Sequence, residues 1–185
     1  MKYRVVERQY LSKMCFVCGV NNEAGTKAEF FVCENVGAHD CAQHDCAQPE
    51  KVLLTVVQPR EVHQSYPDRM HGGVISALLD ESIGRAMQIH NPDLWAVTID
   101  LQVKFRKAVP LDQTIYIESR VTSIGKRAFE SEGKMFLGDG TVCATATGKF
   151  FIVPVEKTFM GDNKAEDYLV ISEEAVPEYI ITNNE

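Results

Sequence analysis

The chain has 185 residues, enough for one domain that buries its own hydrophobic core. Hydrophobic residues make up 45% and charged residues 24%, as in an ordinary globular protein, and the net charge of -7 argues against nucleic acid or an anionic membrane as the main partner. No apolar run has the length of a secretory signal or a transmembrane helix. We therefore expect a cytoplasmic protein whose six cysteines are thiols or metal ligands.

The first part of the chain is predicted to contain two strands. Residues 1–12 have weak helical character, and the turn-rich segment CFVCGVNNEAGT follows them. Residues 27–33 and 51–58 have the apolar, β-branched composition of strands. A polar segment rich in Cys and His separates these two strands, and its composition predicts a loop.

The stretch YPDRMHGGVISALLDESIGRA predicts a long, well-buried helix. From Gly72 onward, apolar residues recur at helical spacing as far as Met87, and Pro92 ends the pattern. Asp80 and Glu81 lie among these aliphatic residues. Two adjacent carboxylates in an apolar helix are unusual, and they indicate a chemical role.

Four strands are predicted after the helix, at residues 95–109, 114–125, 126–138 and 141–153. Asp139-Gly140 is a strong hairpin signal between the last two. The acidic segment from residue 155 is expected to contain a short helix and an extended piece. One helix with one antiparallel sheet makes the fold class α+β, and so apolar a helix requires a sheet curved around it.

The segment MHGGVISALLDE, followed by AVTIDLQVKFRKAVPLDQTIYIESRV, resembles the hotdog-fold acyl-CoA thioesterase superfamily of the PaaI-like type. CFVCGVNNEAG and HQSYPDRMHGG are similar to motifs of one branch, although Ser65 replaces the usual glycine. The resemblance covers roughly residues 15–153 and implies a curved antiparallel sheet wrapped around one long central helix. We expect an N-terminal extension at 1–14, a hotdog domain at 15–154 with a Cys/His-rich insert at 34–50, and an acidic tail at 155–185.

The chemistry of a thioester explains why a His-Gly-Gly turn and an acid occur together. A helix N-terminus offers free backbone amides and a positive dipole end, and glycine lets a carbonyl approach them. The resemblance makes the Gly72 amide the oxyanion donor and Asp80 the nucleophile or general base. It also implies that Thr98 positions the attacking water and that Gln64 helps to polarise the carbonyl.

One chain alone cannot supply both catalytic groups to one carbonyl. Asp80 lies eight residues after Gly72, which is about 12 Å along a helix, whereas each group must lie within hydrogen-bond distance of the substrate. Two chains solve the problem when Gly72 of one faces Asp80 of the other. The resemblance implies the same arrangement, so we expect a homodimer or homotetramer.

Other residues are predicted to bind substrate, an acyl-CoA thioester. Basic side chains would contact the phosphates of coenzyme A, although a solvated sheet edge explains them equally well. For Asp80, the competing interpretation is an ordinary helix residue that is either solvated or paired with a cation such as Arg85. The predicted substrate-binding residues are His63, Ser65, His71, Gly73, Glu81, Lys104, Arg106 and Arg127.

The cysteines leave two interpretations open. We expect no cofactor, since the CFxCG motif of the resembling branch is a structural turn. The alternative is tetrahedral zinc, with Cys15, Cys18, Cys41 and Cys46 as candidate ligands. The expected activity is hydrolysis of an acyl-CoA, and the alternative is a non-catalytic acyl-CoA-binding or regulatory protein.

Overall fold

The structure is a computed structural model that describes residues 1–36, 50–154, 157 and 168–182. Its helical elements are η1 (Glu61–His63), α1 (Gly72–Arg85) and η2 (Ala86–Ile89). Its strands are β1 (Lys2–Arg8), β2 (Leu11–Ser12), β3 (Glu29–Asn35), β4 (Lys51–Val57), β5 (Trp95–Phe105), β6 (Ile115–Ile124), β7 (Ala128–Leu137), β8 (Val142–Val153), β9 (Leu169–Val170) and β10 (Tyr179–Ile181).

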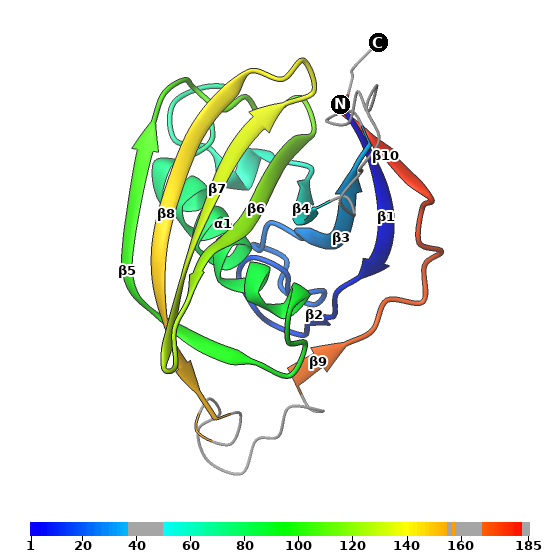
Figure 1. Cartoon of the computed structure of the whole chain (residues 1–185). Coiled ribbons are helices and arrows are strands. Elements are labelled where there is room, and N and C mark those ends of the chain that lie inside the picture. Colours follow the sequence, from blue (N-terminus) through cyan, green and yellow to red (C-terminus); the bar gives the residue numbers. More distant parts are fainter. Residues whose placement is uncertain (37–49, 155–156, 158–167, 183–185) are drawn as a thin grey trace, which may run out of the picture.

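Eight of these strands form one antiparallel sheet in the order β10-β1-β3-β4-β6-β7-β8-β5. Figure 1 shows this sheet curving around α1, with β5 and β10 at its two edges. The short strands β2 and β9 pair separately. The predicted architecture, a curved antiparallel sheet around one central helix, is confirmed.

The core lies between α1 and the concave face of the sheet. Leu78, Leu79 and Ile83 of the helix are fully buried there. A Cβ atom added at Gly133 of β7 or at Gly148 of β8 would lie 2.7 or 2.8 Å from the Ile83 side chain. The two glycines therefore let the helix pack directly onto the strands, and this contact fixes the position of the helix.

The predicted helix and the predicted strands after it are confirmed, with small differences at their ends. The α-helix ends at Arg85 and continues as the 3-10 turn η2 to Ile89. Gly140 has a φ of 84°, as the predicted hairpin requires of its glycine. The regular alternation predicted for β5 is interrupted by a bulge between Thr98 and Asp100.

The prediction of a helix over residues 1–12 is wrong, because this segment forms β1 and β2. Tyr3 is fully buried, and β1 pairs with both β3 and β10. These partners are distant in sequence, so local composition did not reveal them. The tail contributes the extended segments β9 and β10, as expected in part, and Cys41 and Cys46 lie outside the described residues.

No helix in the described part of the chain is both long enough and apolar enough to cross a bilayer.

Candidate active site

The first turn of α1 leaves one backbone amide free. His71 caps the helix in an extended conformation, and its Nδ1 accepts a hydrogen bond of 2.9 Å from the amide of Gly73. The amides of Val74 and Ile75 both donate to the carbonyl of His71, at 3.0 and 3.1 Å. Among the described residues, the Gly72 amide has no acceptor. The histidine thus occupies the Gly73 amide and leaves that of Gly72 for a ligand.

The loop before the helix is held by its own hydrogen bonds. His63 is only 1% exposed; its carbonyl accepts from the amide of His71 at 2.8 Å, and its Nδ1 accepts from the amide of Arg60 at 3.1 Å. The Gln64 Oε1 accepts from the amide of Asp68 at 3.2 Å, and Gln64 remains exposed. His63 therefore supports the turn from inside, and Gln64 keeps its side-chain NH₂ for another partner.

Asp80 lies two turns further along α1 and faces β5. Its Oδ1 accepts a hydrogen bond of 2.8 Å from the hydroxyl of Thr98. Burial raises the pKa of the Asp80 carboxyl, the hydrogen bond from Thr98 opposes this rise, and the negative charge of Glu81 adds to it. The folded chain thus places Thr98 beside Asp80, while the role predicted for Thr98, positioning the attacking water, stays a prediction. The competing ion pair of Asp80 with Arg85 is not formed, because Arg85 pairs with Glu81.

A cavity of about 330 Å³ opens beside Asp80. One side is formed by the C-terminal half of α1, and another by the start of β5, from Trp95 to Thr98. The lining combines polar side chains with aromatic and apolar ones, among them Tyr10, Leu94, Phe150 and Tyr168. The cavity can hold an apolar group next to an acid.

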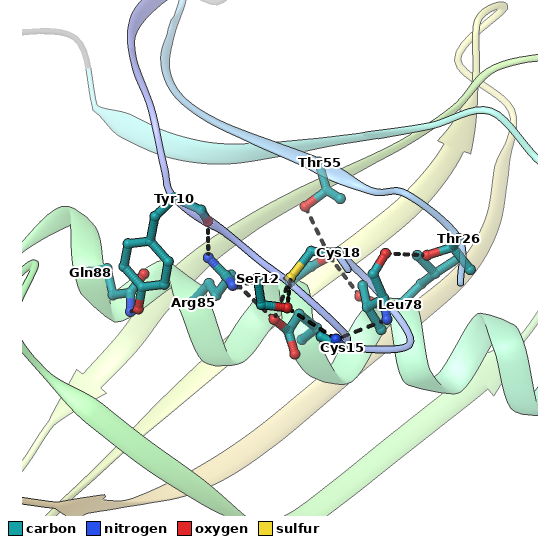
Figure 2. A network of polar contacts seen from close by, with 12 residues as sticks. Tyr10, Ser12, Cys15, Cys18, Thr26, Thr55, Leu78, Arg85 and Gln88 are labelled. Atoms are coloured by element: carbon teal, nitrogen blue, oxygen red, sulfur yellow. Dashed lines mark hydrogen bonds and ion pairs between the residues drawn. The ribbon is translucent and has the colours of Figure 1, made fainter. Parts of the chain in front are cut away.

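Glu81 has different surroundings from Asp80. Its Oε1 accepts a hydrogen bond of 2.8 Å from the Arg85 Nε and lies 3.8 Å from the Sγ of Cys18. The Arg85 guanidinium also donates to the carbonyl of Tyr10 at 2.9 Å and to the Cys18 sulfur at 3.4 Å (Figure 2). Glu81 was predicted to bind substrate, but these contacts give it a packed environment at the rim of the cavity.

The predicted basic residues do not meet Asp80 within one chain. Lys104 and Arg106 line a separate cavity of about 390 Å³, together with Glu118, Arg120 and others from four neighbouring strands. Arg127 lines a third cavity at the β6–β7 turn. Neither cavity shares a residue with the one beside Asp80.

Sequence reasoning missed the polar network behind the acidic pair. Glu81 and Arg85 are four residues apart, a spacing that favours a helical ion pair and could have revealed their contact. Tyr10 and Gln88 also belong to this network: the Gln88 Nε2 donates to the Tyr10 hydroxyl at 2.5 Å. Nothing in the local sequence signals that Tyr10 reaches the helix, since 78 residues separate it from Gln88.

Gly72 and Asp80 lie toward opposite ends of one surface. Thr98, beside Asp80, is near the start of β5, whereas a Cβ atom built on Gly72 would be 3.6 Å from the ring of Phe105, at its end. The helix and β5 therefore run in opposite directions past each other. The structure does not bring the two predicted catalytic groups together within one protomer.

The segment that carries Gly72 and Asp80 matches a known family. Residues 68–144 fit the thioesterase superfamily model. The architecture that surrounds α1 is the hotdog fold, as the sequence motifs predicted. The narrower PaaI-like assignment stays a prediction.

Three similar proteins illustrate the relationship. PA0474 of Pseudomonas aeruginosa, provisionally named as an esterase, is 26% identical over 56% of this chain and 77% of its own length. The bovine acyl-coenzyme A thioesterase THEM4 is 26% identical over 59% of this chain, but that match spans only 44% of the bovine protein. The crystal structure of BH2602 from Bacillus halodurans with CoA has a TM-score of 0.50 and 25% identity over 54% of this chain and 70% of that one.

Proposed function

We propose that this protein hydrolyses an acyl-CoA thioester to a carboxylic acid and free CoA. The unpaired Gly72 amide serves as oxyanion donor, and Asp80 acts as nucleophile or general base. The observation that carries the proposal is the presence, on one helix, of a free helix-terminal amide and of an acid that lines a cavity. The CoA in the related BH2602 structure and the activity named for bovine THEM4 support the substrate class.

The exposed edge of β5 supports assembly of a two-chain site. β5 is the terminal strand of the eight-stranded sheet and has only β8 as a neighbour in the described residues. Its side chains Val97, Ile99 and Phe105 are 46%, 56% and 56% exposed. A long apolar edge strand without a partner is a ready template for pairing with another chain. We propose that a second copy of this chain pairs with the exposed edge of β5.

The direction of β5 determines which residues of two paired chains lie opposite each other. Two antiparallel β5 strands related by a two-fold axis near Leu101 place Thr98 of one chain opposite Phe105 of the other. Thr98 contacts Asp80, and Phe105 adjoins Gly72. The same operation therefore brings Asp80 of one protomer toward Gly72 of its partner, and it makes two equivalent sites per dimer. Asp80 and Gly72, which lie far apart within one chain, thus come together between two chains.

In this arrangement each group has a distinct task. The partner's Gly72 amide stabilises the negative charge that develops on the thioester oxygen. Asp80 either removes a proton from a water molecule that attacks the carbonyl carbon, or attacks that carbon itself and forms a mixed anhydride that water then hydrolyses to the acid. In both routes the thiolate of CoA leaves. Thr98 holds one carboxylate oxygen of Asp80, which leaves the other oxygen for the reaction. His71 keeps the Gly73 amide occupied, so that only one amide faces the oxygen.

The test is release of free thiol from a panel of aliphatic and aromatic acyl-CoAs. We expect turnover by the wild-type protein and a loss of about 10²- to 10⁴-fold in kcat for Asp80→Asn, the range typical of a general acid–base residue. The matched control is Asp93→Asn, which alters an exposed aspartate in the turn after the helix. Binding of acyl-CoA without turnover by the wild type would contradict the proposal and favour the non-catalytic alternative. Equal activity of Asp80→Asn and wild type would contradict the role of Asp80.

A further inference from the structure

We propose that Cys15, Cys18 and Glu81 form a binding site for one zinc-class divalent ion, which joins the Cys15–Cys18 turn to α1. One Sγ atom from each cysteine and one carboxylate oxygen of Glu81 all lie within 4.8 Å of one another. Thiolate and carboxylate are both ligands that zinc accepts. Tetrahedral zinc bonds of about 2.3 Å to sulfur and about 2.0–2.2 Å to oxygen require only a small contraction of this cluster. The inference is independent of the proposed thioesterase activity.

The Cys15–Cys18 turn is already folded in the shape that a metal needs. The amide of Val17 donates to the Cys15 Sγ at 3.3 Å, and the amide of Gly19 donates to the Cys15 carbonyl at 2.8 Å. A Cβ atom added at Gly19 would lie 2.3 Å from that carbonyl oxygen, so the tight turn requires glycine. The Ser12 hydroxyl fixes the start of the turn by accepting from the Cys15 amide at 3.1 Å. Because these hydrogen bonds already hold the turn, metal binding would immobilise few additional groups.

The third ligand comes from a distant part of the chain. Glu81 lies on α1, 63 residues from Cys18, yet its Oε1 is 3.8 Å from the Cys18 sulfur. Cys18 is buried, and the Glu81 side chain is 26% exposed. Figure 2 shows the Cys15–Cys18 turn passing over α1 at this point. Two ligands from a turn and one from a helix define the site, and a water molecule would complete tetrahedral coordination of the ion.

The surrounding charge favours a divalent cation. Deprotonated Cys15, Cys18 and Glu81 carry three negative charges, and the buried Arg85 guanidinium beside them supplies one positive charge. The remaining two negative charges are those that one divalent ion neutralises. Each thiol releases its proton to solvent when its sulfur–metal bond forms. Arg85 then acts as a hydrogen-bond donor to the ligands Cys18 and Glu81 rather than as their only counter-ion.

The first experiment uses the full-length protein, stripped with a chelator under reducing conditions and titrated with Co²⁺ or Zn²⁺. We expect one ion per chain and, with Co²⁺, a thiolate-to-cobalt charge-transfer band. Cys18→Ala should abolish the band, and Glu81→Gln should weaken binding by about 10-fold or more. Cys33→Ala is the matched control, since Cys33 is an equally buried thiol on β3. Unchanged binding by Cys18→Ala, or no binding by the wild type, would overturn the proposal.

A second experiment combines a measurement on the wild-type protein, which does not depend on the folding of a variant, with one double variant. X-ray absorption at the zinc edge of the wild-type protein should show two sulfur neighbours at about 2.3 Å, with the remaining neighbours being oxygen or nitrogen. The double variant Cys41→Ala/Cys46→Ala should retain the ion. A shell of four sulfur atoms, or loss of the ion in that double variant, would place the metal on the Cys/His segment instead and refute the site proposed here.

Discussion

Asp80 and Glu81 are neighbours in sequence, but they belong to two different regions of the molecule. Successive residues of a helix point about 100° apart, so Asp80 faces the exposed strand β5 while Glu81 faces the Cys15–Cys18 turn. The Asp80 carboxylate accepts a hydrogen bond from Thr98 and adjoins a cavity. Glu81 has a buried arginine and a thiol as partners. The catalytic region consists of Gly72, Asp80 and β5; the packed region consists of Glu81, Arg85 and the turn.

The difference shows how one helix provides two chemical environments. In the catalytic region, a backbone amide and a carboxylate oxygen have no partner within the described chain, so a substrate can bind both. In the packed region, the Arg85 guanidinium donates to the Glu81 carboxylate, to the Tyr10 carbonyl and to the Cys18 sulfur, so the Glu81 carboxylate already has a partner within the chain. Changes in the first region should therefore affect turnover, and changes in the second should affect stability.

Apart from substitution of Asp80 itself, the largest expected effect comes from removing the Gly72 amide. Gly72→Pro deletes the N–H at the first helical position, where proline is well tolerated, and the extended conformation of His71 suits a following proline. We expect kcat to fall by about 10²- to 10³-fold, as for other oxyanion donors, with little change in the unfolding midpoint. Gly72→Ala is the control, because it adds a Cβ at ordinary contact distance from Phe105 but keeps the amide. Equal losses of kcat in Gly72→Pro and Gly72→Ala would indicate steric crowding of the site rather than loss of the hydrogen-bond donor.

A mixture of two inactive variants tests whether each active site is formed by two chains. Gly72→Pro and Asp80→Asn homodimers should each be inactive, but a heterodimer retains one intact pair of Gly72 and Asp80. Random exchange of equal amounts should restore about a quarter of wild-type activity, since half of the dimers are mixed and each has one working site. No recovery after proven subunit exchange would show that each chain must supply both groups itself.

A smaller effect, on stability, is expected in the packed region. Arg85→Met, in metal-free protein, leaves Glu81 without its cation and removes the hydrogen bond to the Tyr10 carbonyl. We expect the free energy of unfolding to fall by about 3 kcal/mol, at the lower end for a broken buried pair, because Glu81 keeps 26% exposure. Urea denaturation measures this loss. The double variant Arg85→Met/Glu81→Gln should recover part of it, since the unpaired charge is gone, and the absence of any recovery would contradict this ion-pair explanation.

The parts of the fold that were predictable depend on local pattern. The helix from Gly72 and the hairpin at Gly140 follow from periodicity and turn chemistry within a few residues. The choice of Asp80 and Thr98 as candidate site residues came from a family resemblance that spans the helix and the next strand, and the hydrogen bond between them is a feature of the folded chain. These features join residues that are close in sequence or belong to one motif.

The features that were missed depend on contacts between distant segments. β1 forms a strand because β3 and β10 flank it in the sheet, and residues 1–12 alone do not reveal those partners. The exposed side chains Val97 and Ile99 result from the edge position of β5 and from its bulge, neither of which alternation can predict. The approach of Cys18 to Glu81 likewise requires the folded chain.

The smallest expected effect concerns the hydroxyl that joins the two elements of the catalytic region. Thr98→Val removes the hydrogen bond to Asp80 and keeps the shape of the side chain. One such bond contributes about 0.5–1.5 kcal/mol, so kcat should fall by up to roughly 10-fold, while the KM for acyl-CoA should change less. Thr98→Ser, which keeps the hydroxyl, should retain most of the activity. If Val and Ser reduce kcat equally, the methyl group of Thr98 rather than its hydroxyl positions the carboxylate, and the hydrogen bond between β5 and α1 has no catalytic role.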